Sequence, residues 1–325
     1  MKINFMNVGE GDMTILEIEG KIVLIDVNIS SRDDEAYKIL KQVAYNGIID
    51  YLIITHPHND HIKGIDIIDE DFEIRNIWES GFRFEKEKEN EEDEDYQKFI
   101  NIIERKGSYQ LKASKEKIDF PDENLEIYCL NSKNNNVQDD SPEGIHYNCL
   151  VIKLIYKNIS ILFTGDSNWK VWNEKILGPY DDLLNSDILH ASHHGSRTFF
   201  MLENEGHDAQ HNIEHLEDIE PQYTIISAWT NEEKNKAGKP EFPPHDDAIE
   251  LYEEYTTEDG GVYITGNEGN IIFNIEENSV NLDKASKFGY VFSKGRRQKI
   301  KEYKENTVKT RHESPTKMMD RRFGE

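Results

Sequence analysis

The chain has 325 residues and a formal net charge of −26, with 64 acidic against 38 basic side chains. Hydrophobic residues make up 36% of it and aromatic residues 10%, which is enough apolar surface for a buried core and excludes an acidic disordered protein. No window approaches the roughly 18 apolar residues of a membrane span, and the N-terminus has no cleavable hydrophobic segment, so we expect a soluble, cytoplasmic protein that does not engage a membrane.

Short apolar runs of β type alternate with polar helical stretches along the chain. The predicted strands are Lys2–Val8, Met13–Ile18, Ile22–Asp26, Tyr51–Thr55, Ile74–Trp78, Leu125–Leu130, Cys149–Ile155, Ile159–Thr164, Ile188–Ala191, Tyr223–Ser227, Val262–Thr265 and Asn270–Ile275. The predicted helices are Asp33–Tyr45, Asp95–Lys106, Asn168–Ile176, Ile213–Ile219 and His245–Tyr255. Many strands interleaved with helices predict a layered sandwich with helices outside.

The net charge is unevenly distributed. Residues 281–325 carry thirteen basic and six acidic side chains, so this tail has a charge of about +7 and the first 280 residues about −33. The run Glu85–Asp95 holds eight acids, two lysines and no apolar side chain, which predicts a solvated acidic insertion near residues 84–95. The total charge argues against tight, nonspecific binding along nucleic acid, which depends on clustered basic residues.

Four potential metal ligands fall within six residues, directly after the apolar run Tyr51–Ile54. They are His56, His58, Asp60 and His61. His56 and His58 lie two apart in an extended segment, so they point the same way and can share one ion. After the chain turns, Asp60 and His61 can hold a second ion about 3.5–4 Å from the first. The cluster therefore predicts a binuclear metal site.

Such a site needs further ligands at other strand ends. Asp166 follows the apolar run Ile161–Thr164 and a glycine, and its carboxylate suits a bridging ligand, although a Gly-Asp pair alone usually marks a turn. His190, His193 and His194 lie within five residues at the end of another apolar run. Three histidines so close together favour a site over ordinary packing.

These residues resemble the metallo-β-lactamase-fold hydrolases and, among them, the hydrolase domain of bacterial competence DNA-uptake (ComEC-like) proteins. The resemblance covers roughly residues 1–275, and its motifs are Phe5–Asp12, Leu24–Asp26, His56-x-His58-x-Asp60-His61, Tyr147–Val151, Thr164–Asp166, His193–Ser196 and Pro244–His245. It implies an α/β fold, a four-layer αββα sandwich, with two divalent ions, Zn or Mn, at one edge. We expect this hydrolase domain over residues 1–280 and a basic C-terminal tail over 281–325.

The resemblance also implies roles for particular residues. The expected metal ligands are His56, His58, Asp60, His61, Asp166 and His193. His194 is expected behind the ligands or against a phosphate, while His190 competes with both for the metal. The third motif offers either His146 or Asn148. His245 is a ligand, a substrate-binding residue or only the start of a helix, and Asp26 is expected to orient a ligand histidine.

The expected chemistry is hydrolysis. A water bridging two ions becomes hydroxide near neutral pH and attacks phosphorus or a carbonyl carbon, with Asp60 orienting it. His194 or His245 then stabilises the developing charge or protonates the leaving oxygen. We expect a phosphodiester substrate, a nucleic acid or a nucleotide, so that the protein is a nuclease or phosphodiesterase.

Two alternatives stay open. The same ions support lactone, thioester or amide hydrolysis. The acidic insertion and the basic tail also suggest a partner-dependent effector subunit that binds another protein through one of these segments.

Two other residue sets attract attention. Cys129 and Cys149 are too few for a disulfide framework and lack metal-ligand spacing, so we expect buried free thiols. His207, His211 and His215 are spaced four apart, which predicts one helical stripe, either a solvated face or a third metal site.

Overall fold

The computed structural model describes residues 1–84, 91–133, 140–200, 212–276 and 279–283, without the side chains of residues 91–93 and 283. These residues all lie in the first of two units, Met1–Gly289. The first part of the predicted acidic insertion and the tail from residue 284 onward lie outside the described residues. Residues from Glu91 belong to a helix, which thus begins four residues before the predicted one.

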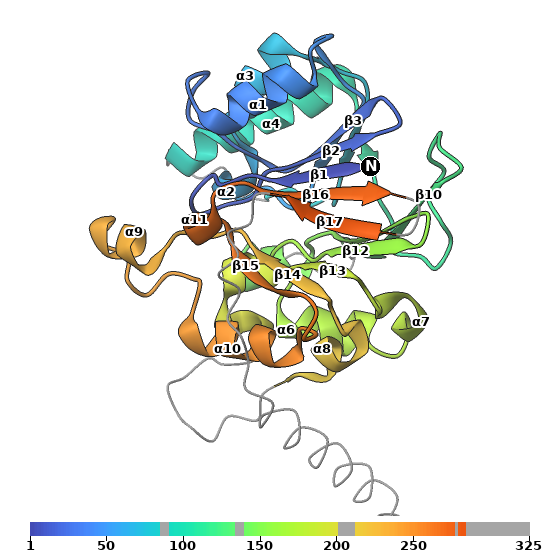
Figure 1. Cartoon of the computed structure of the whole chain (residues 1–325). Helices are drawn as coiled ribbons and strands as arrows, with labels where there is room; N and C mark the ends of the chain where they lie inside the picture. Colours follow the sequence, from blue (N-terminus) through green and yellow to red (C-terminus); the bar gives the residue numbers. More distant parts are fainter. Residues whose placement is uncertain (85–90, 134–139, 201–211, 277–278, 284–325) are drawn as a thin grey trace, which may run out of the picture. The chain divides into compact units, whose positions relative to one another are not determined.

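Two mixed sheets form the centre of the structure (Figure 1). The first has, in spatial order, β17 (Ser279–Asp283), β16 (Ile271–Glu276), β1 (Lys2–Phe5), β2 (Thr14–Ile18), β3 (Lys21–Ile25), β6 (Tyr51–Ile54), β8 (Ile77–Glu79) and β9 (Tyr109–Gln110). The second has β10 (Leu125–Asn131), β11 (Val151–Tyr156), β12 (Ile159–Phe163), β13 (Ile188–His190), β14 (Tyr223–Ile226) and β15 (Gly261–Ile264). A small pair, β5 (Ile48–Ile49) and β7 (Glu73–Ile74), and the short β4 (Val27–Asn28) complete the strands of the described part.

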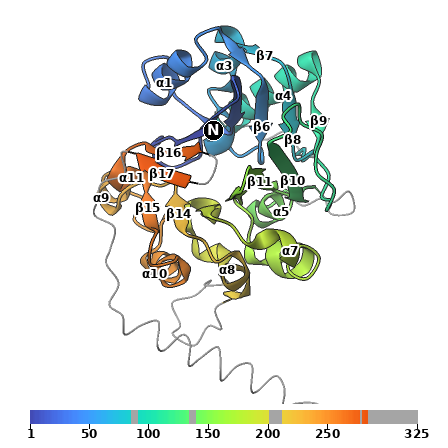
Figure 2. The same ribbon diagram turned by 45° about the vertical axis from the view of Figure 1, so that its right-hand side comes forward.

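Helices cover the outer face of each sheet, and further short helices lie at the edges of the sheets (Figures 1 and 2). Those of the first half are α1 (Glu35–Val43), α2 (Asn59–Ile62), α3 (Ile65–Asp71), α4 (Glu91–Lys106) and α5 (Pro142–Tyr147). Those of the second half are α6 (Trp169–Val171), the π-helix η1 (Trp172–Ile176), α7 (Asp181–Leu184), the 3-10 helices η2 (Ser192–Gly195) and η3 (Arg197–Phe199), α8 (Glu214–Ile219), α9 (Asn231–Lys236), α10 (Asp246–Tyr255) and α11 (Thr265–Glu268).

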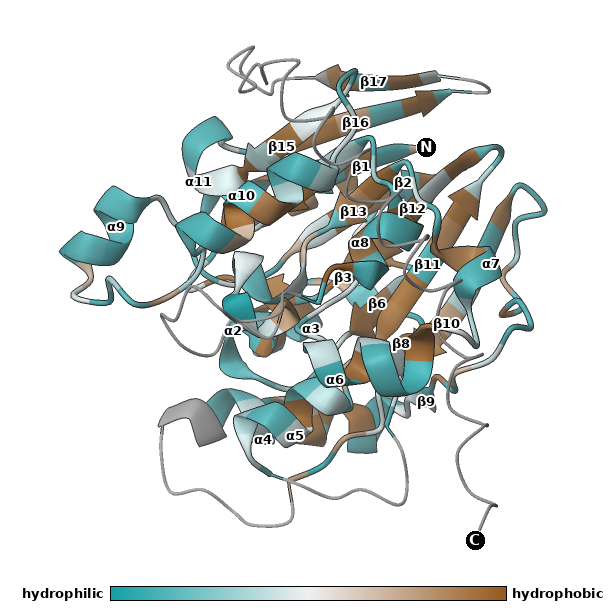
Figure 3. Cartoon of the chain, turned by 90° about the horizontal axis from the view of Figure 1, so that it is seen from below, coloured by the Kyte–Doolittle hydropathy of each residue, from teal (hydrophilic) through white to brown (hydrophobic). Residues whose placement is uncertain are grey.

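The two-residue period of the strands produces three apolar layers. In β3, Val23 lies in the core between the sheets, whereas Leu24 lies in the core under α1, α3 and α4. In β12, Ile161 lies between the sheets and Leu162 packs against the helices of the second half. Figure 3 shows the hydrophobic residues concentrated in the strands. The result is the predicted four-layer αββα sandwich.

Each predicted strand has a counterpart in the structure, with ends that differ by a few residues. The prediction Ile74–Trp78 is divided between β7 and β8, and the C-terminal strand β17 extends the first sheet to Asp283. The elements not predicted are short and polar or lack a clear period, among them β9 and α5. In the described part of the chain, no helix has the length and apolar character needed to span a bilayer.

The prediction that His207, His211 and His215 form a solvated face or a third metal site is wrong for His215, the one of the three that the structure describes. His215 is fully buried, with its ring 4.1 Å from the Phe199 ring and 5.5 Å from that of Trp172 between centroids. Neither ring nitrogen has a hydrogen-bond partner among the described residues. Burial lowers the pKa of His215 to about 3, so the imidazole is neutral in the folded protein. His207 and His211 lie outside the described residues.

This histidine should make the protein sensitive to acid. In the unfolded chain His215 titrates near 6.5, so protons favour unfolding as the pH falls below that value. We expect His215 alone to lower the free energy of unfolding by about 2 kcal/mol between pH 7 and pH 5. The variant His215→Leu should lack this part of the pH dependence. Urea unfolding of both proteins at both pH values measures it; an equal loss in the two proteins would contradict the prediction.

Candidate metal centre

The candidate site residues converge at one edge of the two sheets. The His56 loop follows β6, Asp166 follows β12, and the histidine segment follows β13, which pairs parallel with β12. Because parallel strands end at the same edge of a sheet, the segments after β12 and β13 start side by side. Helix α5, between β10 and β11, brings His146 to the same place.

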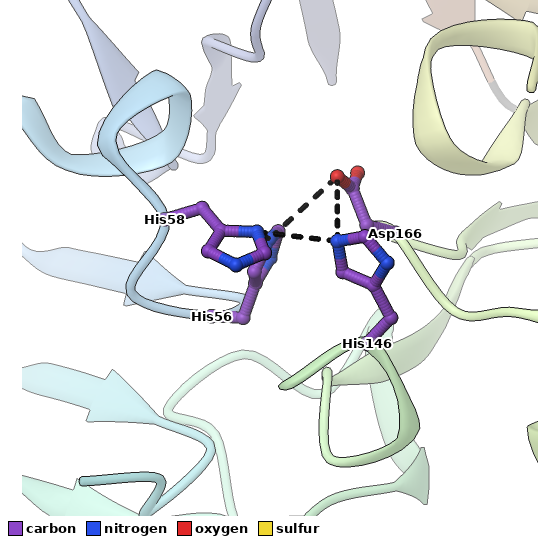
Figure 4. Close-up of side chains that lie close together, drawn as sticks. All are labelled: His56, His58, His146 and Asp166. Atoms are coloured by element: carbon purple, nitrogen blue, oxygen red, sulfur yellow. Dashed lines mark hydrogen bonds and ion pairs between the residues drawn. The ribbon is translucent and has the colours of Figure 1, made fainter. Parts of the chain in front are cut away.

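The first ligand group consists of His56, His58, His146 and Asp166 (Figure 4). His58 Nδ1 lies 3.0 Å from His56 Nε2 and 3.2 Å from His146 Nε2. Asp166 Oδ2 lies 3.6 and 3.7 Å from these two Nε2 atoms. Ligand atoms at the corners of a tetrahedron with zinc-like bonds lie about 3.4 Å apart. The group therefore has the spacing that one tetrahedral ion requires.

The second ligand group consists of Asp60, His61, Asp166 and His194. His61 Nε2 lies 3.3 Å from Asp166 Oδ1, and His194 Nε2 lies 3.3 Å from Asp60 Oδ2. His61 Nε2, His194 Nε2 and Asp166 Oδ1 are buried without a hydrogen-bond partner among the described residues. Buried polar atoms that converge without partners are costly, so this set fits a cation. Asp166 belongs to both groups and presents one oxygen to each.

The two groups differ in their electrostatics. Burial lowers the pKa of all three histidines of the first group, that of His58 to about 4, so they are the neutral imidazoles that metal binding needs. Around His61, burial also opposes the charged form, but Asp166, Asp60 and Asp26 outweigh it and raise the pKa well above its usual value. The carboxylates of the second group therefore require positive charge, which protonated histidines supply without an ion and a divalent ion would supply in their place.

Asp26 holds His61 from behind. Its carboxylate accepts hydrogen bonds of 2.7 Å from both the backbone N and the Oγ1 of Thr55, and it lies 2.8 Å from His61 Nδ1. This leaves His61 Nε2 facing the second ligand group, so Asp26 can orient the ring, although Asp12, Asp26 and His61 also form a further group of possible ligand atoms. Asp26 has a left-handed backbone with φ 56°, an uncommon conformation for aspartate that the buried contacts maintain.

Two supporting residues were not predicted. The backbone N of Asp12 donates to the carbonyl of Asp60 at 3.1 Å, and its buried Oδ1 lies 3.3 Å from His190 Nε2 and 3.8 Å from His194 Nδ1. Cys149 is a buried free thiol whose Sγ accepts from the backbone N of Asp166 at 3.3 Å. Both residues lie in motifs of the resemblance, Phe5–Asp12 and Tyr147–Val151, but the sequence did not indicate that either supports the ligand groups.

In the histidine turn, His194 and not the expected His193 lies in a group of possible ligand atoms, while His193 Nε2 lies 3.8 Å from Asp166 Oδ2. Both have left-handed φ angles, 47° and 54°, so their side chains diverge. His194 anchors Nδ1 2.9 Å from the Ser227 carbonyl and directs Nε2 into the second ligand group. His193 lies outside both groups, with Nδ1 2.9 Å from Thr198 Oγ1. The geometry thus favours His194 as the ligand and His193 as the neighbouring group.

The structure also separates the remaining candidates. His146 joins the first ligand group, whereas Asn148 turns away and donates to a backbone oxygen of α5 at 2.8 Å. His190 Nε2 lies 2.9 Å from Ser227 Oγ, and His190 belongs to neither group. His245 precedes α10 and faces a backbone oxygen at 3.1 Å, also outside both groups.

Residues 6–126 match the family described as the metallo-beta-lactamase superfamily, and the αββα sandwich is the metallo-β-lactamase fold. Members of this superfamily typically bind metal ions. The matched segment contains the His56–His61 motif but not His146, Asp166 or His194.

Several solved structures are similar to the chain. Igni18, a metallo hydrolase from Ignicoccus hospitalis, is 11% identical, with 85% of this chain and 100% of that chain covered and a TM-score of 0.49. A diphosphatase from the PhnP family is 14% identical, with 87% of this chain and 100% of that chain covered and a TM-score of 0.42. The diiron β-hydroxylase CmlA from Streptomyces venezuelae is 13% identical, with 81% of this chain and 52% of that chain covered and a TM-score of 0.46. The search of curated proteins found no match.

The ligand assignment predicts metal content. We expect His194→Ala to bind one divalent ion fewer per chain than the parent protein, and His193→Ala to keep the parental content, because only His194 lies in a ligand group. Asp166→Ala should weaken both positions. Elemental analysis after gel filtration counts the ions; loss of one ion from His193→Ala but none from His194→Ala would reverse the assignment.

Asp12 should position the second group. Asp12→Asn keeps the size of the side chain and the backbone bond to Asp60 but removes the charge beside His190 and His194. We expect the affinity for the second ion to fall about 10- to 100-fold, with the first ion retained. Competition with a chelating dye measures both affinities, and Asp187→Asn, which alters a carboxylate bonded to Ser160 instead, is the matched control.

Proposed function

We propose that the protein is a binuclear metal-dependent hydrolase that cleaves phosphodiesters, as a nuclease or nucleotide phosphodiesterase. The observation that carries the proposal is the pair of four-residue ligand groups that share Asp166. Two divalent ions held there, Zn or Mn, would lower the pKa of a bound water to near 7 and polarise the substrate oxygens. Two adjacent ions suit an in-line displacement at phosphorus, in which the attacking and leaving oxygens lie on opposite sides.

The chain's own residues supply orientation and proton transfer. Asp60 keeps 34% of its side chain exposed although it belongs to a ligand group, so one oxygen can accept a hydrogen bond from the attacking water. His193 keeps 22% exposed, and its ring packs against that of His146 at 4.3 Å between centroids. We propose that His193 contacts the substrate phosphate or protonates its leaving oxygen, the role first expected of His194 or His245.

The resemblance of the Phe5–Asp12 turn and the His193–Ser196 segment to ComEC-like hydrolase domains supports a phosphodiester over a carbonyl substrate. Within the proposal, residues 1–280 are the hydrolase domain, and the acidic insertion and residues 281–325 are additions to it. A protein partner for either addition stays a prediction.

A substrate panel tests the reaction. The metal-loaded protein should cleave at least one of single-stranded DNA, duplex DNA, RNA or cyclic nucleotides, and chelation should stop it. Asp60→Ala and Asp166→Ala should lower the rate at least about 100-fold, because each removes a ligand carboxylate. Asp33→Ala, at a side chain that is 99% exposed, should keep the parental rate.

The same panel includes a lactone, a thioester and an amide. Protein that holds its metal and hydrolyses one of these, but releases nothing from any phosphodiester, would contradict the proposal in favour of carbonyl chemistry.

A further inference from the structure

A cleft of about 750 Å³ opens at the ends of β9 and β10. Its walls are the segment after β9, the end of β10 and the segment around Lys175–Tyr180. The lining includes three lysines, Lys112, Lys133 and Lys175, and no aspartate or glutamate. This composition is unusual for a chain whose first 280 residues have a net charge of about −33.

The cleft lies at the same edge of the sheets as the ligand groups. β9 runs parallel to β8, and β8 parallel to β6, so the end of β9 lies at the edge where β6 leads into the His56 loop. In the second sheet β10, β11 and β12 are antiparallel neighbours, so β10 ends where β12 leads to Asp166. Each wall is two strands from a ligand segment, a separation of about 10 Å.

Within the described part of the chain, no carboxylate lies within ion-pair distance of these three lysines, and Glu174 acts on Lys175 only from further away. None of them takes part in an ion pair there, unlike Lys115 nearby, which pairs with Asp182 at 2.6 Å. Lys112 is exposed, and Lys133 is half-buried. Like charges gathered in one cleft repel each other, so the cleft is complementary to an anion.

Lys175 lines the cleft and is held in place by Tyr147. Its Nζ donates to the carbonyl of Tyr147 at 2.8 Å and lies 3.7 Å from the centre of the Tyr147 ring. Burial lowers the pKa of Lys175 to about 8, so this ammonium is incompletely compensated by its surroundings. Asn131 donates to the same carbonyl at 3.2 Å, and Tyr147 directly follows His146. The segment that carries a metal ligand thus also forms the back of the cleft.

We propose that this cleft binds the backbone phosphates of a single nucleic-acid strand while another phosphodiester of that strand lies at the metal centre. The inference rests on the proposed phosphodiester hydrolysis and narrows its substrate to a chain rather than a cyclic nucleotide. A separation of about 10 Å spans at most about three nucleotides, because 3.4 Å is the axial rise per nucleotide within a duplex and a single strand can be more extended. Tyr180 and Pro179, also in the lining, provide an apolar wall against which a base can pack.

Binding to an uncleavable strand tests the cleft without relying on catalysis. The probe is a short fluorescein-labelled phosphorothioate single strand, measured by anisotropy with the full-length, metal-loaded protein. The triple variant Lys112→Gln, Lys133→Gln, Lys175→Gln should bind at least about tenfold more weakly, and its salt dependence should lose a slope of about 2, as expected for three phosphate contacts. Metal content and urea unfolding of the variant establish that the fold and the centre are intact.

A matched variant controls for net charge. Lys21→Gln, Lys38→Gln, Lys41→Gln makes the same change at the first residue of β3 and on α1, so it should bind like the parent protein. Equal binding by the parent and the cleft variant, or an equal loss in both triple variants, would overturn the proposal.

Kinetics separate this inference from the proposed function. With an unmodified oligonucleotide, the cleft variant should have a higher KM and a lower kcat/KM than the parent protein. With the small substrate bis(p-nitrophenyl) phosphate, kcat/KM should fall less between the same two proteins. If the parent hydrolyses neither compound, the proposed function fails, and the binding comparison still decides whether the cleft takes a strand. If the parent hydrolyses both and the cleft variant shows the same ratio of kcat/KM values, only the cleft inference fails.

Discussion

The site depends on placing the Asp166 carboxylate, almost without solvent exposure, among histidines from separate segments of the chain. One oxygen faces His56 and His146, and the other faces His61. A buried carboxylate is stable only where positive charge or hydrogen bonds compensate it. The two sheets meet this requirement because their strand ends deliver the His56 loop and Asp166 to one edge. The fold thus brings histidines from separate segments to a buried carboxylate that would be unstable without them.

Part of the chain's acidic character lies at this site. Asp12, Asp26 and Asp166 are all buried near His61, and divalent ions would balance them. The lysine cleft, two strands away, has the opposite charge: its three lysines form no ion pair with a carboxylate in the described structure. A phosphate-bearing chain would complement the lysine cleft and, with divalent ions bound, the metal centre, whereas the net charge of −26 disfavours binding elsewhere on the surface.

Much of the architecture and the ligand motif could be predicted from residue patterns. Alternation in β3, β6 and β12 is a local property, and the spacing of His56, His58, Asp60 and His61 is local too. The choice between His193 and His194 was not predictable, because adjacent left-handed residues send their side chains in divergent directions. Only the contacts of Ser227 and Thr198 decide which imidazole faces the second ligand group.

The sequence by itself therefore determined the layered α/β class, the presence of a metal-ligand motif and the segments able to complete it. Tertiary structure alone decided that His146 and not Asn148 joins the first group, that Asp12 lies behind the second, and that His215 is buried in an aromatic core. The physical reason is that period and spacing are encoded within a few residues. The direction and burial of a polar side chain instead depend on three-dimensional contacts, which can join residues far apart in the sequence, as with Asp12 and His190.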